Sequence, residues 1–297
     1  MARVTTALAV LVLGAAGALP AQSYVAPGDT FPPPSARAET ASRDSVPPLP
    51  GKPVFSRGDL VALAAFTAGT AALIPFDERL ADWMRSDSRQ NVTALRSGAT
   101  VFRLLADPGA IAIATGMYAA GRLARRPGTA DAGLHATEAI VVSGAVTGFL
   151  KLATGRARPY LSSPTKPSEF PPGVAEFRPW RGRGGYTSFP SGHTTAAFAA
   201  AAALSSELRR SRPGTARWAS PVLYGTATLG GLSRMYDNKH WATDVAAGAA
   251  IGTLAGWKIV GLQHDRPQSR LDRWLLRTSA APARGGGMLL LWTVRTP

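Results

Sequence analysis

Between residues 57 and 262 the chain alternates apolar runs rich in Ala and Gly with short connections that contain Arg. Six runs are long enough for a helix, and none shows the strict period of two that a half-buried β-strand requires. These runs cover residues 60–76, 109–124, 134–152, 194–208, 221–232 and 241–262. A further amphipathic helix is expected within residues 78–105 as a connector. The pattern therefore predicts an all-α fold, a six-helix bundle.

The segment before the bundle has a different composition. Arg3 precedes an uncharged apolar run at 7–18, and small residues follow it, so residues 1–23 are expected to be a signal peptide or an uncleaved anchor. Residues 24–56 are rich in Pro and predict an extended linker. The domain is expected at 57–264. A basic tail at 265–297 contains an apolar run at 288–292 that fits a strand or a packing segment.

The apolar runs favour a membrane-embedded bundle, since only 17% of the residues are charged, against roughly a quarter in soluble domains. Arg clusters follow the second, fourth and sixth runs, which places those connections in the cytoplasm and the other helix ends in the periplasm. A cleaved signal followed by six spans would give the opposite orientation. Three interpretations therefore remain open: the first helix does not span, the N-terminal run is not a signal, or the bundle is soluble in the periplasm.

The charge balance restricts the partners. A formal net charge of +15 suits an anionic partner such as a membrane surface or a phosphorylated substrate. Nucleic acid is disfavoured, because the basic residues are divided among short connections rather than gathered in one patch. The chain contains no cysteine, which excludes disulfide scaffolds, thiolate nucleophiles and Cys-ligated metal sites.

Two polar sequence elements at helix ends suit an anion. Lys151 and Arg158 are cations at the end of the third run, where they fit a tetrahedral oxyanion or simply the helix dipole. Ser191, Gly192 and His193 precede the fourth run, and their backbone N–H groups can converge on an anion at a helix N-terminus. Ser191 also fits a plain N-cap, so both interpretations of this turn stay open.

The third element combines Arg234, His240 and Asp244. On a helix, His240 and Asp244 share one face, and the carboxylate can orient the imidazole as in catalytic triads. A surface His–Asp pair is the simpler alternative. A zinc site formed by His193, His240 and Asp244 is a rival that the neighbouring cations Lys151, Arg158 and Arg234 weaken.

Taken together, K-x6-RP, PSGH and SR-x5-H-x3-D in that order resemble the type 2 phosphatidic acid phosphatase and vanadium haloperoxidase superfamily at every fixed position. The resemblance covers about residues 60–262. It implies a phosphatase without a metal or other cofactor, in which His240 is the nucleophile, Asp244 holds its tautomer and His193 is the general acid. It also implies that the phosphate is bound by Lys151, Arg158, Ser191, Gly192 and Arg234.

The connection at 160–189 carries aromatic and basic residues beside this site, which fits either a lipid headgroup or ordinary packing of a lid. The leading hypothesis is a phosphatase or diphosphatase acting on a lipid phosphate at the periplasmic face of a bacterial inner membrane. The alternatives are a vanadate-dependent haloperoxidase, a soluble periplasmic acid phosphatase and a non-catalytic phosphate-binding protein. Of the remaining histidines, His135 is expected to face the bundle and His264 to lie on the surface.

Overall fold

The computed structural model describes residues 56–161, 177–180, 182, 185–265, 278–283 and 287–292. The predicted signal segment at 1–23 and the predicted linker at 24–56, except Ser56, lie outside the described residues, as does most of the basic tail. Every described residue belongs to one compact unit, Lys52–Pro297.

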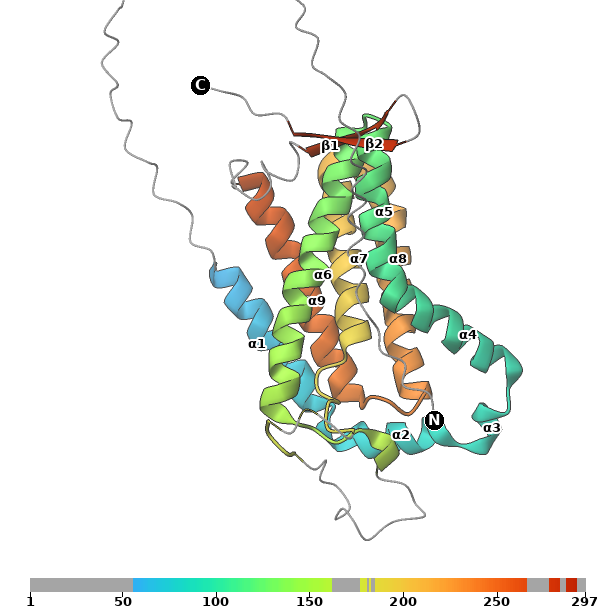
Figure 1. Cartoon of the computed structure of the whole chain (residues 1–297). Helices are drawn as coiled ribbons and strands as arrows, with labels where there is room; N and C mark the ends of the chain where they lie inside the picture. The colour runs from blue at the N-terminus through green and yellow to red at the C-terminus, as the bar shows by residue number, and fades with distance from the viewer. Residues whose placement is uncertain are drawn as a thin grey trace, which may run out of the picture. The chain divides into compact units, whose positions relative to one another are not determined.

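Each of the six apolar runs coincides with a helix over most of its length. The helices are α1 (Arg57–Ala72), α5 (Ala110–Leu123), α6 (Pro127–Thr154), α7 (Gly192–Ser211), α8 (Pro213–Tyr236) and α9 (Ala242–Asp265) (Figure 1). Two short 3-10 helices, η1 (Ile74–Phe76) and η3 (Pro159–Leu161), follow α1 and α6. The prediction of an all-α domain is confirmed for the described residues of the predicted domain at 57–264.

The connector differs from the prediction of one amphipathic helix. It consists of α2 (Asp77–Arg85), α3 (Asp87–Gln90) and α4 (Thr93–Leu104). Ser86 has extended backbone angles between α2 and α3, and Val92 does so before α4, so neither break can carry a continuous helix. A π-helical segment, η2 (Leu105–Gly109), then leads into α5 and contains Asp107 in an extended conformation. Pro108 explains this kink, because the residue before a proline is disfavoured in the helical region.

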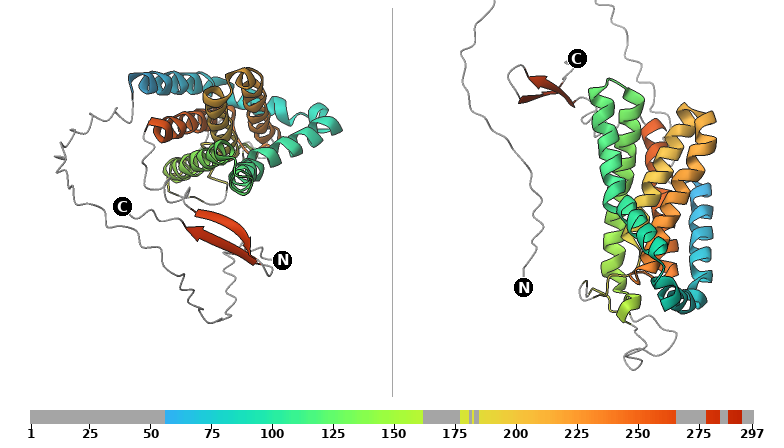
Figure 2. Two further views of the ribbon diagram at one scale, coloured as in Figure 1. Left: turned by 90° about the horizontal axis from the view of Figure 1, so that it is seen from above. Right: turned by 90° about the vertical axis from the view of Figure 1, so that its right-hand side faces the viewer.

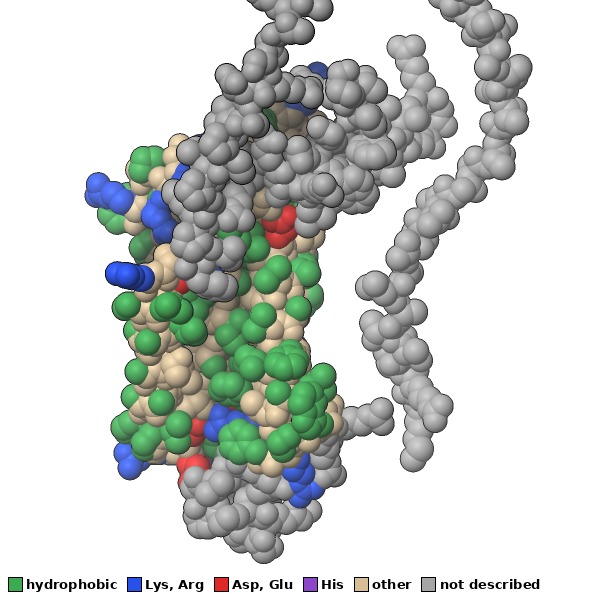
Figure 3. Space-filling model, turned by 90° about the vertical axis from the view of Figure 1, so that its left-hand side faces the viewer, with side chains coloured by type: hydrophobic (Ala, Val, Ile, Leu, Met, Phe, Trp, Pro, Cys, Tyr) green, Lys and Arg blue, Asp and Glu red, His purple; other side chains and the backbone are tan. Residues whose placement is uncertain are grey.

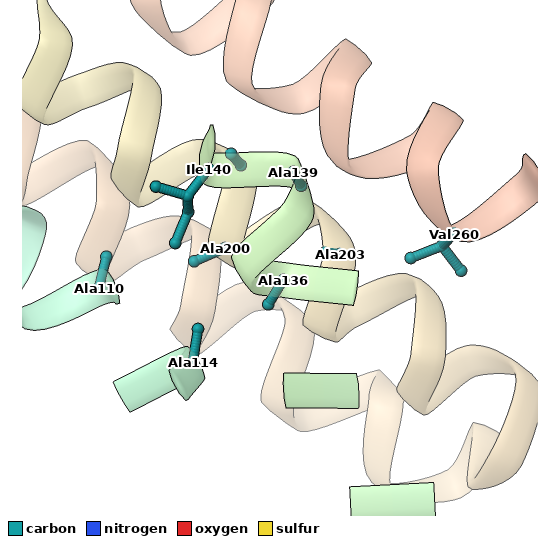
Figure 4. Close-up of a cluster of buried hydrophobic side chains, with 9 residues drawn as sticks. Ala110, Ala114, Ala136, Ala139, Ile140, Ala200, Ala203 and Val260 are labelled. Atoms are coloured by element: carbon teal, nitrogen blue, oxygen red, sulfur yellow. The ribbon is translucent and has the colours of Figure 1, made fainter. Parts of the chain in front are cut away.

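Helix α7 packs against α6, α8 and α9 (Figures 1 and 2). The buried side chains between these helices are mostly alanine. Figure 4 shows one such cluster, to which α5 contributes Ala110 and Ala114 and α7 contributes Ala200 and Ala203. Because an alanine side chain is a single carbon, the helix backbones can approach one another closely.

The backbones of α7 and α9 approach each other closely. Gly248, Gly252 and Gly256 of α9 are spaced four residues apart and lie against α7. A Cβ on Gly248 would lie 2.6 Å from the carbonyl oxygen of Ser191, and one on Gly252 would overlap the carbonyl oxygen of Thr195. The glycine row therefore brings the backbone of α9 into contact with α7, including the N-terminus of α7.

The large apolar side chains lie outside. Val61, Val141, Phe149, Trp218 and Val222 are all largely exposed, although they belong to three different helices. Figure 3 shows hydrophobic side chains over the middle of one face, with Lys and Arg nearer its two ends. Small residues inside and large apolar residues outside are the arrangement expected of helices that contact lipid.

Three described helical segments are long and apolar enough to cross a membrane: Arg57–Arg85, Pro127–Thr154 and Ala242–Asp265. Helices α5, α7 and α8 are not among them. The structure thus supports a membrane protein, whereas the predicted set of six spans is not confirmed.

A two-stranded antiparallel hairpin lies in the C-terminal tail. Its strands are β1 (Thr278–Ala283) and β2 (Gly287–Trp292), and the register pairs Thr278 with Trp292. The apolar run at 288–292 is therefore a strand, one of the two interpretations that the sequence allowed.

Candidate active site

Four helix ends meet at the lower end of the bundle in Figure 1: the C-termini of α6 and α8 and the N-termini of α7 and α9. They bring together the residues of all three sequence elements, close enough for direct contact or mutual electrostatic influence. The residues are Lys151, Arg158, Ser191, Gly192, His193, Arg234, His240 and Asp244.

Asp244 is the buried anchor of this end and has no exposed surface. Its Oδ2 accepts a hydrogen bond from Ser188 Oγ at 2.5 Å and one from the Trp241 backbone N–H at 2.9 Å. Its Oδ1 accepts from an Arg156 guanidinium nitrogen at 2.7 Å. The donors around Asp244 include a cation, which disfavours the alternative of a zinc site built on this carboxylate.

His240 lies next to Asp244, but not through the helical spacing that the sequence suggested. Helix α9 begins at Ala242, so His240 precedes it, and Asp244 in the first turn caps the N–H of Trp241. The cap folds the chain back and leaves His240 Nδ1 3.5 Å from Asp244 Oδ2. Within the described residues His240 Nδ1 makes no hydrogen bond, so Asp244 is its nearest acidic neighbour rather than a tightly bonded partner.

A second carboxylate supports this arrangement from a distant part of the chain. Asp77, at the start of α2, accepts from Arg156 at 2.7 Å and from both the backbone N–H and the hydroxyl of Thr243 at 2.9 and 2.6 Å. Arg156 thus bridges Asp77 and Asp244, and all three side chains are buried. The bridge ties α2 and the end of α6 to the start of α9.

The turn after α6 places the first pair of cations. Gly155 ends α6 in the left-handed conformation, with φ of 55°, and a Cβ there would overlap the backbone of Arg178. Lys151 Nζ then donates to the carbonyl oxygen of Thr187 at 2.7 Å, and Arg158 donates to the Thr187 hydroxyl at 3.2 Å. Thr187, to which the sequence assigned no role, therefore fixes both cations.

Two guanidinium groups at the site retain unused donors. Arg158 Nε and Arg234 Nε are buried and have no hydrogen-bond partner among the described residues. Leaving a buried donor unsatisfied costs about 1–3 kcal/mol, which an anionic acceptor would recover. The N-terminus of α7 adds the partial positive charge of a helix start at Gly192. The site is therefore suited to an anion with several oxygens.

His193 stands at this helix start beside a residue that the sequence did not single out. Its Nδ1 lies 3.6 Å from Oδ2 of Asp107, the extended residue of η2. Ser191 occupies the N-cap position, but its side chain does not cap the helix, and its Oγ instead accepts a hydrogen bond from Thr194. Ser191 is thus at the N-cap position, as one interpretation of the sequence had it, but its side chain does not make the hydrogen bond of an N-cap.

Both histidines are neutral at pH 7 in this environment. Burial lowers the pKa of His240 to about 4, although Asp244 opposes the change. Burial and the charge of Arg234 lower the pKa of His193 to about 4, although Asp107 opposes it. A neutral His240 carries a free lone pair, whereas His193 needs an additional anion nearby before it holds a proton.

Sequence reasoning missed five supporting residues: Asp77, Asp107, Arg156, Thr187 and Ser188. Arg156 lies between Lys151 and Arg158 and carries the same charge, so no local pattern separates it from them. Asp77 is 166 residues from Thr243, its partner, and only the fold joins the two. A buried carboxylate predicted at the start of a helix gives no indication of its partner.

An all-α domain with cationic groups, two histidines and a buried carboxylate at one end has the features of a phosphoryl-binding helical domain. Residues 132–268 match the PAP2 superfamily. The resemblance seen in the three sequence elements is thereby confirmed.

Similar proteins include the lipid A 1-phosphatase of Porphyromonas gingivalis, which is 45% identical over 69 residues, 23% of this chain and 15% of that protein. A probable diacylglycerol pyrophosphate phosphatase of Schizosaccharomyces pombe is 34% identical over 128 residues, 38% of this chain and 46% of that protein. The chain thus spans less than half the length of these two relatives. A transmembrane PAP2-type phosphatidylglycerolphosphate phosphatase from Bacillus subtilis aligns with a TM-score of 0.37 and 22% identity, over 68% of this chain and 98% of that chain.

Proposed function

We propose that this protein is a phosphatase that hydrolyses phosphate or diphosphate esters of lipids through a phosphohistidine on His240, without a metal ion. The observation that carries the proposal is the set of buried guanidinium donors without partners, at Arg158 and Arg234, around a neutral histidine. Three cations around one phosphoryl group stabilise the charge that develops in phosphoryl transfer. Lys151 supplies the third.

In the first step, the Nε2 lone pair of His240 attacks phosphorus while its Nδ1 faces Asp244. The bond from phosphorus to the lipid oxygen breaks, and His193 gives its proton to that oxygen. The phosphoryl dianion adjoining His193, together with Asp107, offsets the effect of Arg234 and lets His193 hold this proton. The products are the free alcohol and phosphorylated His240.

In the second step, His193 accepts a proton from a water molecule whose oxygen attacks the phosphohistidine. The phosphorus–nitrogen bond breaks, inorganic phosphate leaves and His240 returns to its neutral form. Arg158, Arg234 and the Gly192 N–H act on the phosphoryl oxygens in both steps. The chain's own cations therefore do the electrostatic work that a metal ion does in other phosphatases.

Two features favour a lipid substrate. The helices present large apolar side chains outward, and three segments are long enough to cross a membrane. On the site end, the connection after α6 exposes Tyr160, Phe177 and Trp180, and Trp180 packs edge-on against Phe149. Aromatic residues of this kind gather at the membrane interface. The relatives named as phosphatases of lipid A and of diacylglycerol pyrophosphate agree with this substrate class.

We further propose that the site faces the periplasm. Arg122 lies in the last turn of α5, Arg125 and Arg126 follow it, and Arg209 and Arg210 lie in the last turn of α7, at the opposite end from the site. The positive-inside rule puts that Arg-rich end in the cytoplasm. A compartment reporter fused after Arg212 should report cytoplasm, and a periplasmic signal would reverse the orientation.

The substrate is tested by phosphate release from the purified full chain in detergent micelles. A long-chain isoprenyl diphosphate or phosphatidic acid should give a higher kcat/KM than p-nitrophenyl phosphate, because the remote chain contributes binding energy to the transition state. Equal values for all substrates would leave a general acid phosphatase. Halide oxidation after loading with vanadate would instead support the haloperoxidase alternative.

The mechanism is tested by trapping. A ³²P-labelled substrate quenched in alkali should leave one labelled histidine, located by peptide mapping at His240. His240→Ala should lose the label and all phosphate release, while its thermal unfolding in detergent shows that it folds. Substantial turnover by His240→Ala would remove His240 as the nucleophile. Activity should persist in EDTA.

A further inference from the structure

A second cluster of titratable side chains lies at the end of the bundle opposite the candidate active site. His135 is near the start of α6, Glu207 near the end of α7 and His264 near the end of α9 (upper end in Figure 1). The three come together although 57 to 72 residues separate Glu207 from the histidines. The proposed reaction uses none of them.

The geometry of this cluster is compact. Glu207 Oε1 lies 2.6 Å from His135 Nδ1 and 2.9 Å from His264 Nε2. One ligand atom from each residue can be chosen so that all lie within 4.8 Å of one another. The two imidazole rings are 5.7 Å apart and almost perpendicular. Both rings thus converge on one carboxylate from different helices.

The cluster is mostly buried. Glu207 and His135 are 7% and 4% exposed. Within the described residues Glu207 pairs with these two histidines, whereas neighbouring Arg209 donates to Ser206. A carboxylate buried between two imidazoles is stabilised by a cation bound among them.

Two imidazole nitrogens and one carboxylate oxygen are a ligand set that zinc-class ions prefer. Bonds of about 2.0–2.2 Å in a tetrahedral arrangement place ligand atoms roughly 3.3 Å apart. The present separations of 2.6 to 2.9 Å need only a small outward movement of the side chains. The His264 side chain is 37% exposed, which leaves an open side for the ion to approach and for a water as fourth ligand.

We propose that His135, Glu207 and His264 bind one zinc-class divalent ion, which cross-links α6, α7 and α9 at the end remote from the phosphoryl site. The site is structural. It acts on the three helices that also carry Lys151, His193 and Asp244 at their other ends. The ion therefore restricts how far these helices can move relative to one another without taking part in phosphoryl transfer.

The test uses the full chain in detergent, stripped with EDTA and dialysed. Titration with Zn²⁺ should show one equivalent bound by calorimetry, and Co²⁺ should give the visible absorption of a tetrahedral site. The chain has four histidines and no cysteine, so the assignment can be made by substitution. His264→Gln can still hydrogen-bond Glu207 but should lose the bound equivalent and the Co²⁺ absorption.

Glu207→Gln serves as a second variant, and His240→Ala as a control with a histidine removed from the other end. The unfolding temperature of the unmodified chain and of His240→Ala should rise when Zn²⁺ is added, whereas that of His264→Gln should not. Absence of a saturable equivalent would overturn the proposal. So would binding that survives both His264→Gln and Glu207→Gln, or that His240→Ala abolishes. These metal-binding results do not depend on phosphate release, which tests the proposed function separately.

Discussion

Replacement of Gly252 by alanine tests whether contact between the α7 and α9 backbones positions the active site. The new Cβ would overlap the Thr195 carbonyl oxygen and lie 2.8 Å from the Ala199 amide nitrogen, where an ordinary contact is about 3.4 Å or more. Neither backbone atom can rotate away, so the helices must separate by at least about 0.6 Å.

The expected cost follows from two opposing effects. Overpacking of a tight contact costs about 1–3 kcal/mol, and the higher helix propensity of alanine returns about 0.5–1 kcal/mol. The free energy of unfolding should therefore fall by about 1–2 kcal/mol. Because α7 carries His193 and α9 carries Asp244, the separation should also lower kcat, by up to about 100-fold for a displacement near 1 Å.

Gly261 is a matched control in the same helix, because a Cβ there meets nothing within 4 Å. Gly261→Ala should raise the unfolding temperature slightly or leave it unchanged, and should leave phosphate release intact. The measurement is thermal unfolding of the two variants in the same detergent, followed by turnover of one lipid phosphate. A Gly252→Ala protein as stable and as active as Gly261→Ala would refute the argument from helix contact.

Three further changes have expected outcomes. As the pH falls from 6.5 to about 4, His240 alone should lower the stability by up to about 3 kcal/mol, because the unfolded chain protonates His240 and the folded one does not. In unfolding curves, His240→Gln should remove this part of the pH dependence and leave the part that arises from the lowered pKa of His193. Asp107→Asn should make protonated His193 less stable. The value of kcat should then fall more for an alkyl phosphate than for p-nitrophenyl phosphate, because the p-nitrophenolate leaving group needs no general acid. Equal losses of kcat for the two substrates would contradict the role of His193 as the general acid. Arg156→Ala should lower the free energy of unfolding by about 3–5 kcal/mol, because two buried carboxylates lose their cation. In chemical denaturation, Arg156→Lys should restore part of the lost stability. An Arg156→Ala protein as stable as the unmodified chain would show that the hydrogen bonds to Asp77 hold the carboxylates without the cation.

The helices of the bundle could be predicted because each apolar run is continuous and ends at a polar connection. The connector could not, since its breaks at Ser86 and Val92 depend on single residues inside an otherwise amphipathic pattern. The kink at Asp107, which follows the connector, has a local reason in Pro108. The sequence left open whether all six runs cross the membrane. Helices α6 and α9 are long and apolar enough to do so, whereas α7 and α8 are not among the candidate spans of the described residues.

The predicted site residues come from short motifs in which spacing and residue type carry the information. Their supporting partners do not, because a buried ion pair between α2 and the α6–α7 connection leaves no periodic trace in the sequence. The contact between His240 and Asp244 likewise could be predicted only in part from the sequence. Their proximity could be predicted from a helical spacing, but the chain achieves it by a helix cap that begins one residue after His240.

The alanine core has a consequence for how such a protein can diversify. An alanine side chain has no rotatable χ angle, so its burial costs no side-chain entropy and offers no alternative rotamer. A core of leucine can accommodate a mutation by rearranging its side chains, whereas the mostly alanine cluster around Ala200 and Ala203 must accommodate it mainly by moving whole helices. Inherited changes in substrate range must then arise mainly in the connections between helices, while the phosphoryl-binding ends keep one geometry.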